Sequence, residues 1–169
     1  MLSLFLALTG FNLLCLLLTA ALGYAYGGSE VTQWHALAGV AATITCCAVH
    51  CVVFTYFIAT AKWVRQAVIV KQLDPSLVAP TRSFKLQAFP AALLAMVTVF
   101  AAALFGAARV SYGVSPTYHH VVAWIAVVTN VLVAVTEYRA IARNGRLIDG
   151  ILALINRAPA SASGTGPTA

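Results

Sequence analysis

The sequence predicts an all-α integral membrane protein, a four-transmembrane-helix bundle with cytoplasmic helical extensions. Of its 169 residues, 62% are hydrophobic and only 8% are charged, whereas soluble domains carry about 25% charged residues. The hydrophobic residues gather in four long runs, and about 20 apolar residues cross the hydrocarbon core of a bilayer. Basic residues follow alternate runs, as expected for a chain that crosses the membrane several times.

The four spans are expected at about residues 2–23, 35–60, 89–108 and 118–138, in a single membrane domain covering residues 1–157. Residues 1–3 lack the basic residues of a signal peptide, so the first span is expected to be a retained helix. The third span is expected to begin near Pro90, which a first helical turn tolerates. Residues 158–169 are low in complexity and are predicted to be disordered.

The loops predict the orientation. Residues 24–34 contain Glu30 and no Lys or Arg, whereas nine of the ten basic residues lie after the second and fourth spans: Lys62, Arg65, Lys71, Arg82, Lys85, Arg139, Arg143, Arg146 and Arg157. Both termini should therefore be cytoplasmic, in a bacterial inner membrane. The second helix is expected to continue to Asp74-Pro75, and the apolar spacing of residues 147–155 predicts an interfacial or partner-binding helix.

The net charge of +6 does not indicate nucleic-acid binding, because the basic residues flank apolar spans and suit anionic lipid. The expected partners are membrane lipids and other membrane subunits or a second copy of the chain. The sequence has no phosphate-binding glycine loop, HExxH motif or Ser/His/Asp combination. We therefore expect a protein that is not catalytic by itself.

Three histidines suggest a cofactor. His35 begins the second span, while His119 and His120 begin the fourth; both spans run in the same direction, so these side chains should share one depth. Two axial imidazoles from facing helices can hold a b-type haem, although adjacent residues point about 100° apart and only one of the pair could face inward. The alternative is an aromatic belt with Trp34 and Tyr118. These matching starts also suggest two similar helical hairpins.

A polar layer is expected at the midplane. His50 lies 15 residues after His35, or about 22 Å along a helix, and an ionisable residue at that depth needs partners. Asn12, Thr98 and Asn130 are expected at the same level. His50 is then either a neutral packing residue bonded to Asn12 or Asn130, or a ligand or proton-handling group.

Two further sites are weaker candidates. Cys47, His50 and Cys51 share one helical face, and thiolates with an imidazole suit Cu(I) or Zn, so His50 is a candidate metal ligand. Small residues for tight packing explain the cysteines equally well. Glu137 is a candidate proton or quinone site on the cytoplasmic side. Its alternative is an ion pair at the interface with one of three basic residues, Lys62, Arg65 or Arg139.

These features favour an inner-membrane electron-transfer subunit that binds one b-type haem between the second and fourth helices, within a larger complex. A second haem is not expected in this chain, because Val133 and Ala134 occupy the place of a second histidine on the fourth helix. The broad shape is similar to small four-helix membrane cytochrome subunits, an analogy of fold alone. The alternative is a cofactor-free structural or assembly subunit.

Overall fold

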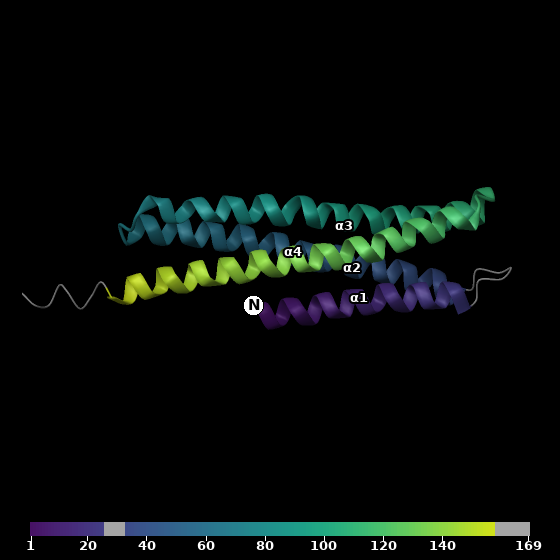
Figure 1. The fold of residues 1–169 in the computed structure, drawn as a ribbon, viewed down its shortest axis with the longest axis horizontal. Helices are drawn as coiled ribbons and strands as arrows, with labels where there is room; N and C mark the ends of the chain where they lie inside the picture. Colours follow the sequence, from purple (N-terminus) through teal and green to yellow (C-terminus); the bar gives the residue numbers. More distant parts are fainter. Residues whose placement is uncertain (26–32, 158–169) are drawn as a thin grey trace, which may run out of the picture.

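The computed structural model describes residues 1–25 and 33–157 (Figure 1). It is all-helical, with four long helices and one short 3₁₀ helix: α1 (Leu2–Ala25), α2 (Gln33–Val70), η1 (Pro75–Val78), α3 (Ala79–Tyr112) and α4 (Pro116–Arg157). Each long helix is long and apolar enough to cross a membrane. The disorder predicted for residues 158–169, and the position of Glu30, lie outside the described residues.

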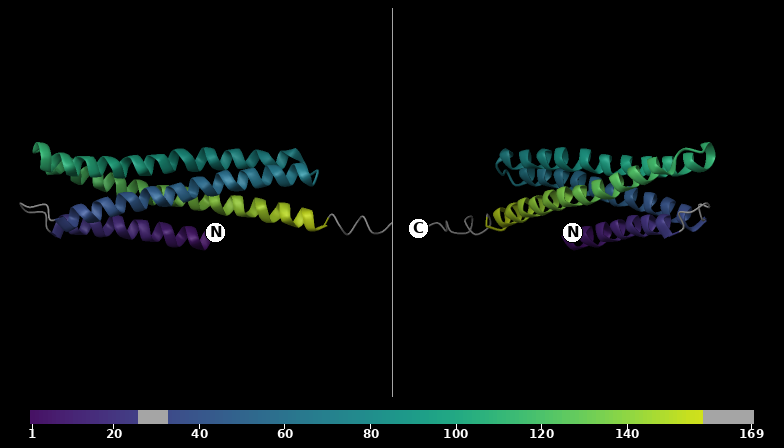
Figure 2. Two further views of the ribbon diagram at one scale, coloured as in Figure 1. Left: turned by 180° about the vertical axis from the view of Figure 1, so that it is seen from behind. Right: turned by 45° about the vertical axis from the view of Figure 1, so that its right-hand side comes forward.

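The long helices lie side by side along one axis (Figures 1 and 2). We call the end with the α3–α4 turn the distal end, and the end with η1 and the last residues of α4 the basic end. Helix α3 packs on α4 and α2, while α1 packs on α2 and α4. Because α1 is the shortest and begins part-way along the molecule, only α2, α3 and α4 continue to the basic end (Figure 1).

Three helix boundaries differ from the sequence-based expectation. Helix α3 begins at Ala79, so Pro90 lies inside the helix rather than in its first turn. Helix α2 ends at Val70, before the expected stop at Asp74. Helix α4 runs unbroken to Arg157, and Ile151 is fully buried, so the predicted separate interfacial helix is the last part of α4. Helices α3 and α4 are thus longer than expected, with buried residues along their added parts, whereas α2 is slightly shorter.

Two turns have clear local causes. The Asp74 carboxylate accepts a hydrogen bond of 2.8 Å from the Ser76 backbone N–H and caps η1. Hydrogen bonding from Ser76 lowers the pKa of the Asp74 carboxyl below its ordinary value. At the distal end, Gly113 follows α3 with φ +65°, a left-handed conformation that glycine adopts without a steric penalty.

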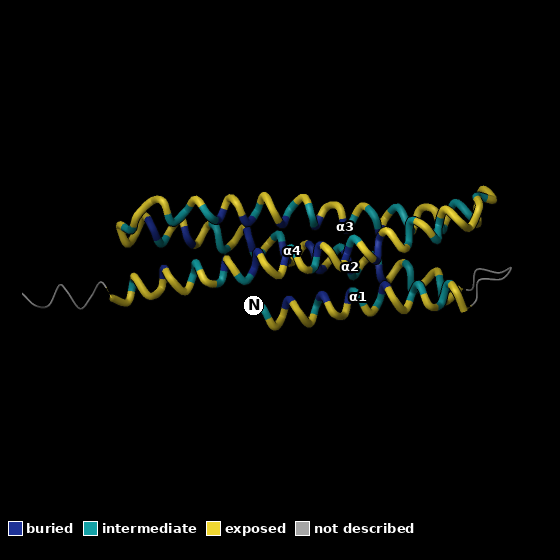
Figure 3. The backbone as a smooth tube through the Cα atoms, viewed as in Figure 1, coloured by how far each residue is buried: buried dark blue, intermediate teal, exposed yellow. Residues whose placement is uncertain are grey.

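Buried positions face the interior of the bundle and exposed positions its outside (Figure 3). The exposed side chains are largely apolar, and several of the buried ones are polar. Large apolar side chains on every helix are more than half exposed, including Leu4, Ile44, Leu104 and Leu132. In contrast, the least exposed side chains include five polar ones: Asn12, His50, Asn130, Glu137 and Asn144. This distribution suits a lipid environment, where the surface is apolar and polar groups find partners between helices.

The buried side of α3 is built from small residues. Ala88, Ala92 and Ala95 have no exposed surface, and their spacing of three to four residues places them on one face. Small side chains let neighbouring helices approach closely, which increases their van der Waals contact. This face allows α3 to lie against both α2 and α4.

We expect Ala92→Leu to destabilise the fold by about 1–3 kcal/mol, because the added carbons have no space between the helices. The measurement is equilibrium unfolding in mixed detergent micelles. Ala48→Leu is the matched control, since Ala48 is exposed on α2. Equal unfolding free energies for the two variants would contradict the close packing of α3.

Candidate cofactor site

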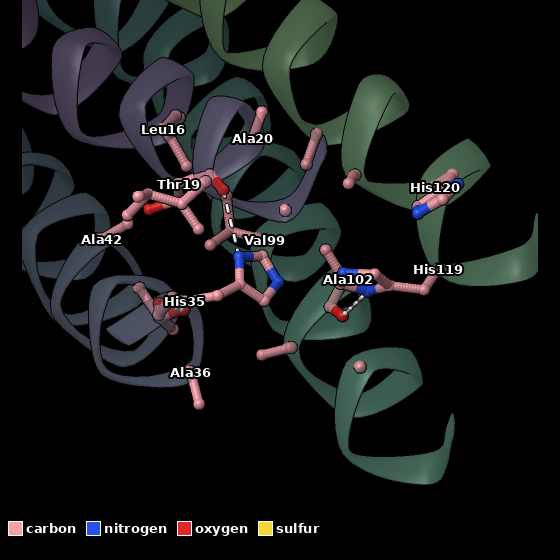
Figure 4. Close-up of a pocket in the computed structure, with 18 of the residues that line it drawn as sticks. Leu16, Thr19, Ala20, His35, Ala36, Ala42, Val99, Ala102, His119 and His120 are labelled. Atoms are coloured by element: carbon pink, nitrogen blue, oxygen red, sulfur yellow. Dashed lines mark hydrogen bonds between the residues drawn. The ribbon is translucent and has the colours of Figure 1, made fainter. Parts of the chain in front are cut away.

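A cavity of about 290 Å³ lies between the four helices near the distal end (Figure 4). Small side chains line much of its wall: Ala20, Gly39, Ala42, Ala102, Gly106 and Ala123. All three histidines predicted as cofactor ligands, His35, His119 and His120, also line it. The cavity is therefore a mainly apolar space into which a few polar groups project, as is typical of ligand sites.

His35 and His119 face each other across this cavity (Figure 4). Their ring centroids are 5.9 Å apart and the ring planes are nearly perpendicular, at 80°. His35 Nδ1 lies 3.1 Å from the Thr19 carbonyl oxygen, and His119 Nδ1 lies 2.9 Å from that of Ala102. A carbonyl only accepts, so each Nδ1 donates; in the neutral ring, Nε2 then carries a free lone pair.

A glycine lies behind each imidazole. A Cβ atom added at Gly23 would be 2.9 Å from Cε1 of His35, and one added at Gly106 would be 3.1 Å from Cε1 of His119. Each glycine follows the carbonyl-bearing residue, Thr19 or Ala102, by four positions and so lies one helical turn further along. The two hairpins therefore hold their histidines in the same way, which extends the similarity suggested by the sequence.

Neither glycine is among the site residues predicted from the sequence. Their contacts with the imidazoles depend on how each helix packs on its neighbour. A signal was present: each histidine near the start of a span has a glycine shortly before the end of the preceding span.

His120 does not face His35. Its ring packs against Tyr24, with centroids 5.3 Å apart. The Tyr24 hydroxyl accepts a 2.7 Å hydrogen bond from Nε1 of Trp124. Of the two histidines on the fourth helix, His119 thus lies opposite His35 (Figure 4). His120 instead belongs to an aromatic group with Tyr24 and Trp124.

The two imidazoles are ligands of the kind that a haem iron takes. Metal-binding histidines usually donate their second ring N–H to a carboxylate or carbonyl, as His35 and His119 do here. With nitrogens about 2 Å from the metal and about 1.2 Å from each centroid, opposed imidazoles have centroids roughly 6.4 Å apart, close to the observed 5.9 Å. At about 290 Å³, the cavity is at the lower limit of size for cofactor pockets.

His50 has a partner that was not expected from the sequence. His50 Nδ1 lies 2.9 Å from Glu137 Oε1, and both side chains are almost completely buried. The expected partners were therefore wrong: His50 does not bond to an asparagine, and Glu137 does not pair with Lys62, Arg65 or Arg139. The other expectation for each residue, that it handles protons, is not tested by this contact. Within residues 1–25 and 33–157 it is the only ion pair found. Glu137 is buried because it lies on the same side of α4 as Asn130.

The expected polar layer is smaller than predicted. Asn12 Nδ2 donates to Asn130 Oδ1 over 3.2 Å, and the Cys46 thiol donates to the same oxygen over 3.5 Å. Thr98 does not join them, because its hydroxyl donates to the Ala95 carbonyl of its own helix. Asn12 and Asn130 thus link α1 to α4, one helical turn beyond the Ala126 wall of the cavity.

The geometry does not support a metal ion at His50. Cys47 is only half-buried and Cys51 is exposed, so these thiols do not converge on the buried imidazole. The described ranges contain no group of three or more His, Cys, Asp or Glu side chains able to hold an ion. The contact with Glu137 instead accounts for one ring nitrogen of His50.

No known protein family, curated protein or solved structure matches the chain. The chemistry of the site must therefore be derived from its own residues. Two arrangements of side chains could carry chemistry: the opposed imidazoles in the cavity, and the buried pair of His50 and Glu137.

We expect Glu137→Ala to destabilise the fold by roughly 3–5 kcal/mol, because it leaves His50 buried without its partner. The double variant His50→Leu/Glu137→Leu should recover much of this loss, since it removes both polar groups. Unfolding in mixed micelles measures both effects.

The control for this experiment is Asp149→Ala, which removes an exposed acid from the same helix. It should change the unfolding free energy little. A double variant that is less stable than Glu137→Ala would contradict this expectation. It would show that the contact between His50 and Glu137 adds more to the unfolding free energy than is regained by removing both buried polar groups.

Proposed function

We propose that the protein is an integral membrane subunit whose four-helix bundle binds one b-type haem between α2 and α4 and carries electrons within a larger complex. The observation that carries this proposal is the pair of opposed imidazoles of His35 and His119, 5.9 Å apart by ring centroid across a mainly apolar cavity. When bound, the haem would supply one-electron redox chemistry.

The protein's own residues prepare the two ligands. The Thr19 and Ala102 carbonyls each fix a tautomer in which Nδ1 carries the hydrogen and Nε2 is free to bind iron. Because these acceptors belong to helix backbones, they do not reorient when a ligand enters. The binding free energy is therefore not reduced by ordering the histidines.

A single haem is consistent with the rest of the interior. His50, the remaining histidine, uses Nδ1 for Glu137. The α4 positions considered for a second ligand, Val133 and Ala134, cannot bind iron. The cavity histidines are therefore the one pair in the described chain that suits bis-imidazole ligation.

The proposed orientation places the basic end in the cytoplasm of a bacterial cell, with both termini inside and the cavity towards the opposite face of the inner membrane. Nine of the ten Lys and Arg residues follow the second and fourth spans, which supports this topology. The exposed apolar side chains would contact lipid and neighbouring membrane subunits, or a second copy of the chain.

A second candidate is a cofactor-free structural or assembly subunit. The observation that favours it is the set of buried polar contacts that hold the helices together: Asn12–Asn130, His50–Glu137 and Thr60–Asn144. These contacts stabilise the fold without any ligand. The two proposals differ in a simple property, because the structural subunit would be colourless.

Visible absorption tests the haem proposal. The protein purified from haem-replete membranes should show a Soret band, and His35→Ala or His119→Ala should lose most of its bound haem because one axial ligand is missing. His120→Ala should retain it, since His120 lies against Tyr24 rather than opposite His35. A colourless wild-type protein would refute the haem function and favour the structural subunit.

The glycines behind the ligands provide an independent test. Gly23→Ala and Gly106→Ala should each lower haem occupancy, because the added methyl group displaces the imidazole that lies 2.9 or 3.1 Å away. Gly10→Ala is the matched control, as no atom lies within 4 Å of its added Cβ. Haem content per protein, by pyridine haemochrome assay, measures the effect; equal content in all three variants would disprove the role of these glycines.

A further inference from the structure

Four buried polar atoms lack a partner within the described residues: Thr9 Oγ1, Asn12 Oδ1, His50 Nε2 and Glu137 Oε2. They come from α1, α2 and α4, the three helices that meet beneath the cavity. An unpaired buried polar group is costly, and proteins usually satisfy such groups with ordered water. Four of them in one region indicate a common cause.

Helix geometry places these atoms at neighbouring levels. The contact of Asn12 and Cys46 with Asn130 provides a shared reference level. Thr9 lies three residues from Asn12, and His50 four residues from Cys46, which puts them about 4.5 Å and about 6 Å from that level, both towards the basic end. The unpaired atoms thus occupy one short stretch of the interior.

The hydrogen-bonding capacities are complementary. A pair with no net charge is either an imidazolium with a carboxylate or a neutral imidazole with a carboxylic acid. In both cases one proton lies between Nδ1 of His50 and Oε1 of Glu137, and Nε2 carries a hydrogen. That hydrogen needs an acceptor. Asn12 Oδ1 only accepts, and Thr9 Oγ1 can accept or donate, so water between them and Nε2 would satisfy all three.

Other titratable groups hardly contribute at this level. Among the buried residues of the four long helices, the only titratable side chain besides the pair is Cys46, which lies on α2. The buried residues of α1 that face this region are Thr9 and Asn12, and those of α3 are alanines. The charge state of the region therefore depends on His50 and Glu137.

We propose that Thr9, Asn12, His50 and Glu137 enclose ordered water and form a proton-binding site in which His50 Nε2 gains and loses the proton. The proton passes between Nε2 and the enclosed water, and no other bond changes. The Glu137 carboxylate stabilises the proton on the ring by its negative charge. This site goes beyond the proposed electron transfer and does not require a haem.

Nuclear magnetic resonance of the full chain in detergent micelles, with ¹⁵N-labelled histidine rings, tests the site. Signals absent from His50→Gln identify His50. In the wild-type protein, Nε2 should carry a hydrogen that exchanges magnetisation with water. In Glu137→Gln, where Nδ1 no longer faces a carboxylate, the fraction of rings with a hydrogen on Nε2 should fall at least about twofold at the same pH.

Two variants separate the water from the pair. Thr9→Val/Asn12→Leu should abolish the contact between water and the Nε2 hydrogen while Nδ1 remains bonded to Glu137. Asn144→Leu is the matched control: it removes another buried amide, which donates to Thr60 Oγ1 over 2.9 Å, and should leave the His50 signals unchanged.

The wild-type spectrum can by itself overturn the proposal. Nε2 without a hydrogen at every pH, or with a hydrogen that has no contact with water, would overturn the proposal. An unchanged fraction of rings with a hydrogen on Nε2 in Glu137→Gln would also overturn it, because the carboxylate would then have no effect on the proton. The measurement uses haem-free protein, so a failure of the haem proposal leaves its result intact.

Discussion

The pairing of buried polar groups between α2 and α4 sets the register on which the rest of the structure depends. Asn130, Glu137 and Asn144 are spaced by seven residues on α4, and each meets a polar group of α2. A slip of α2 against α4 by one helical turn would break these contacts at Glu137 and Asn144 in apolar surroundings, whereas Asn130 would keep its hydrogen bond with Asn12. The same register brings His35 level with His119 at the distal end.

Small residues then determine where the interior is empty. Alanines on α3 allow close packing in the middle of the molecule, whereas at the distal end every long helix contributes alanine, and three of them also glycine, to the cavity wall. The result is a cavity where the imidazoles enter. Small residues thus produce close packing where the helices approach one another, and a cavity where the helices diverge.

Much of this architecture could be predicted from the sequence, because hydrophobic runs and residue counting give spans and depths. Counting residues along the spans correctly predicted that His35 and His119 lie at one level. It failed for Glu137: the span was expected to end near residue 138, but α4 continues as a packed helix to Arg157. It also failed for Thr98, whose rotamer directs the hydroxyl back to Ala95, and for Gly23, whose role depends on the neighbouring helix.

The order of polar groups along the interior connects the two proposals. From the distal end towards the basic end come the cavity histidines, the contact of Asn12 with Asn130, and the pair of His50 with Glu137. A charge added in the cavity would be costly in hydrocarbon surroundings. His50 and Glu137 are the nearest buried groups on this route that can change charge substantially, since Cys46 is a weak acid that already donates to Asn130. A proton bound at His50 would offset an electron held above it, and the intervening asparagines and water would polarise in response.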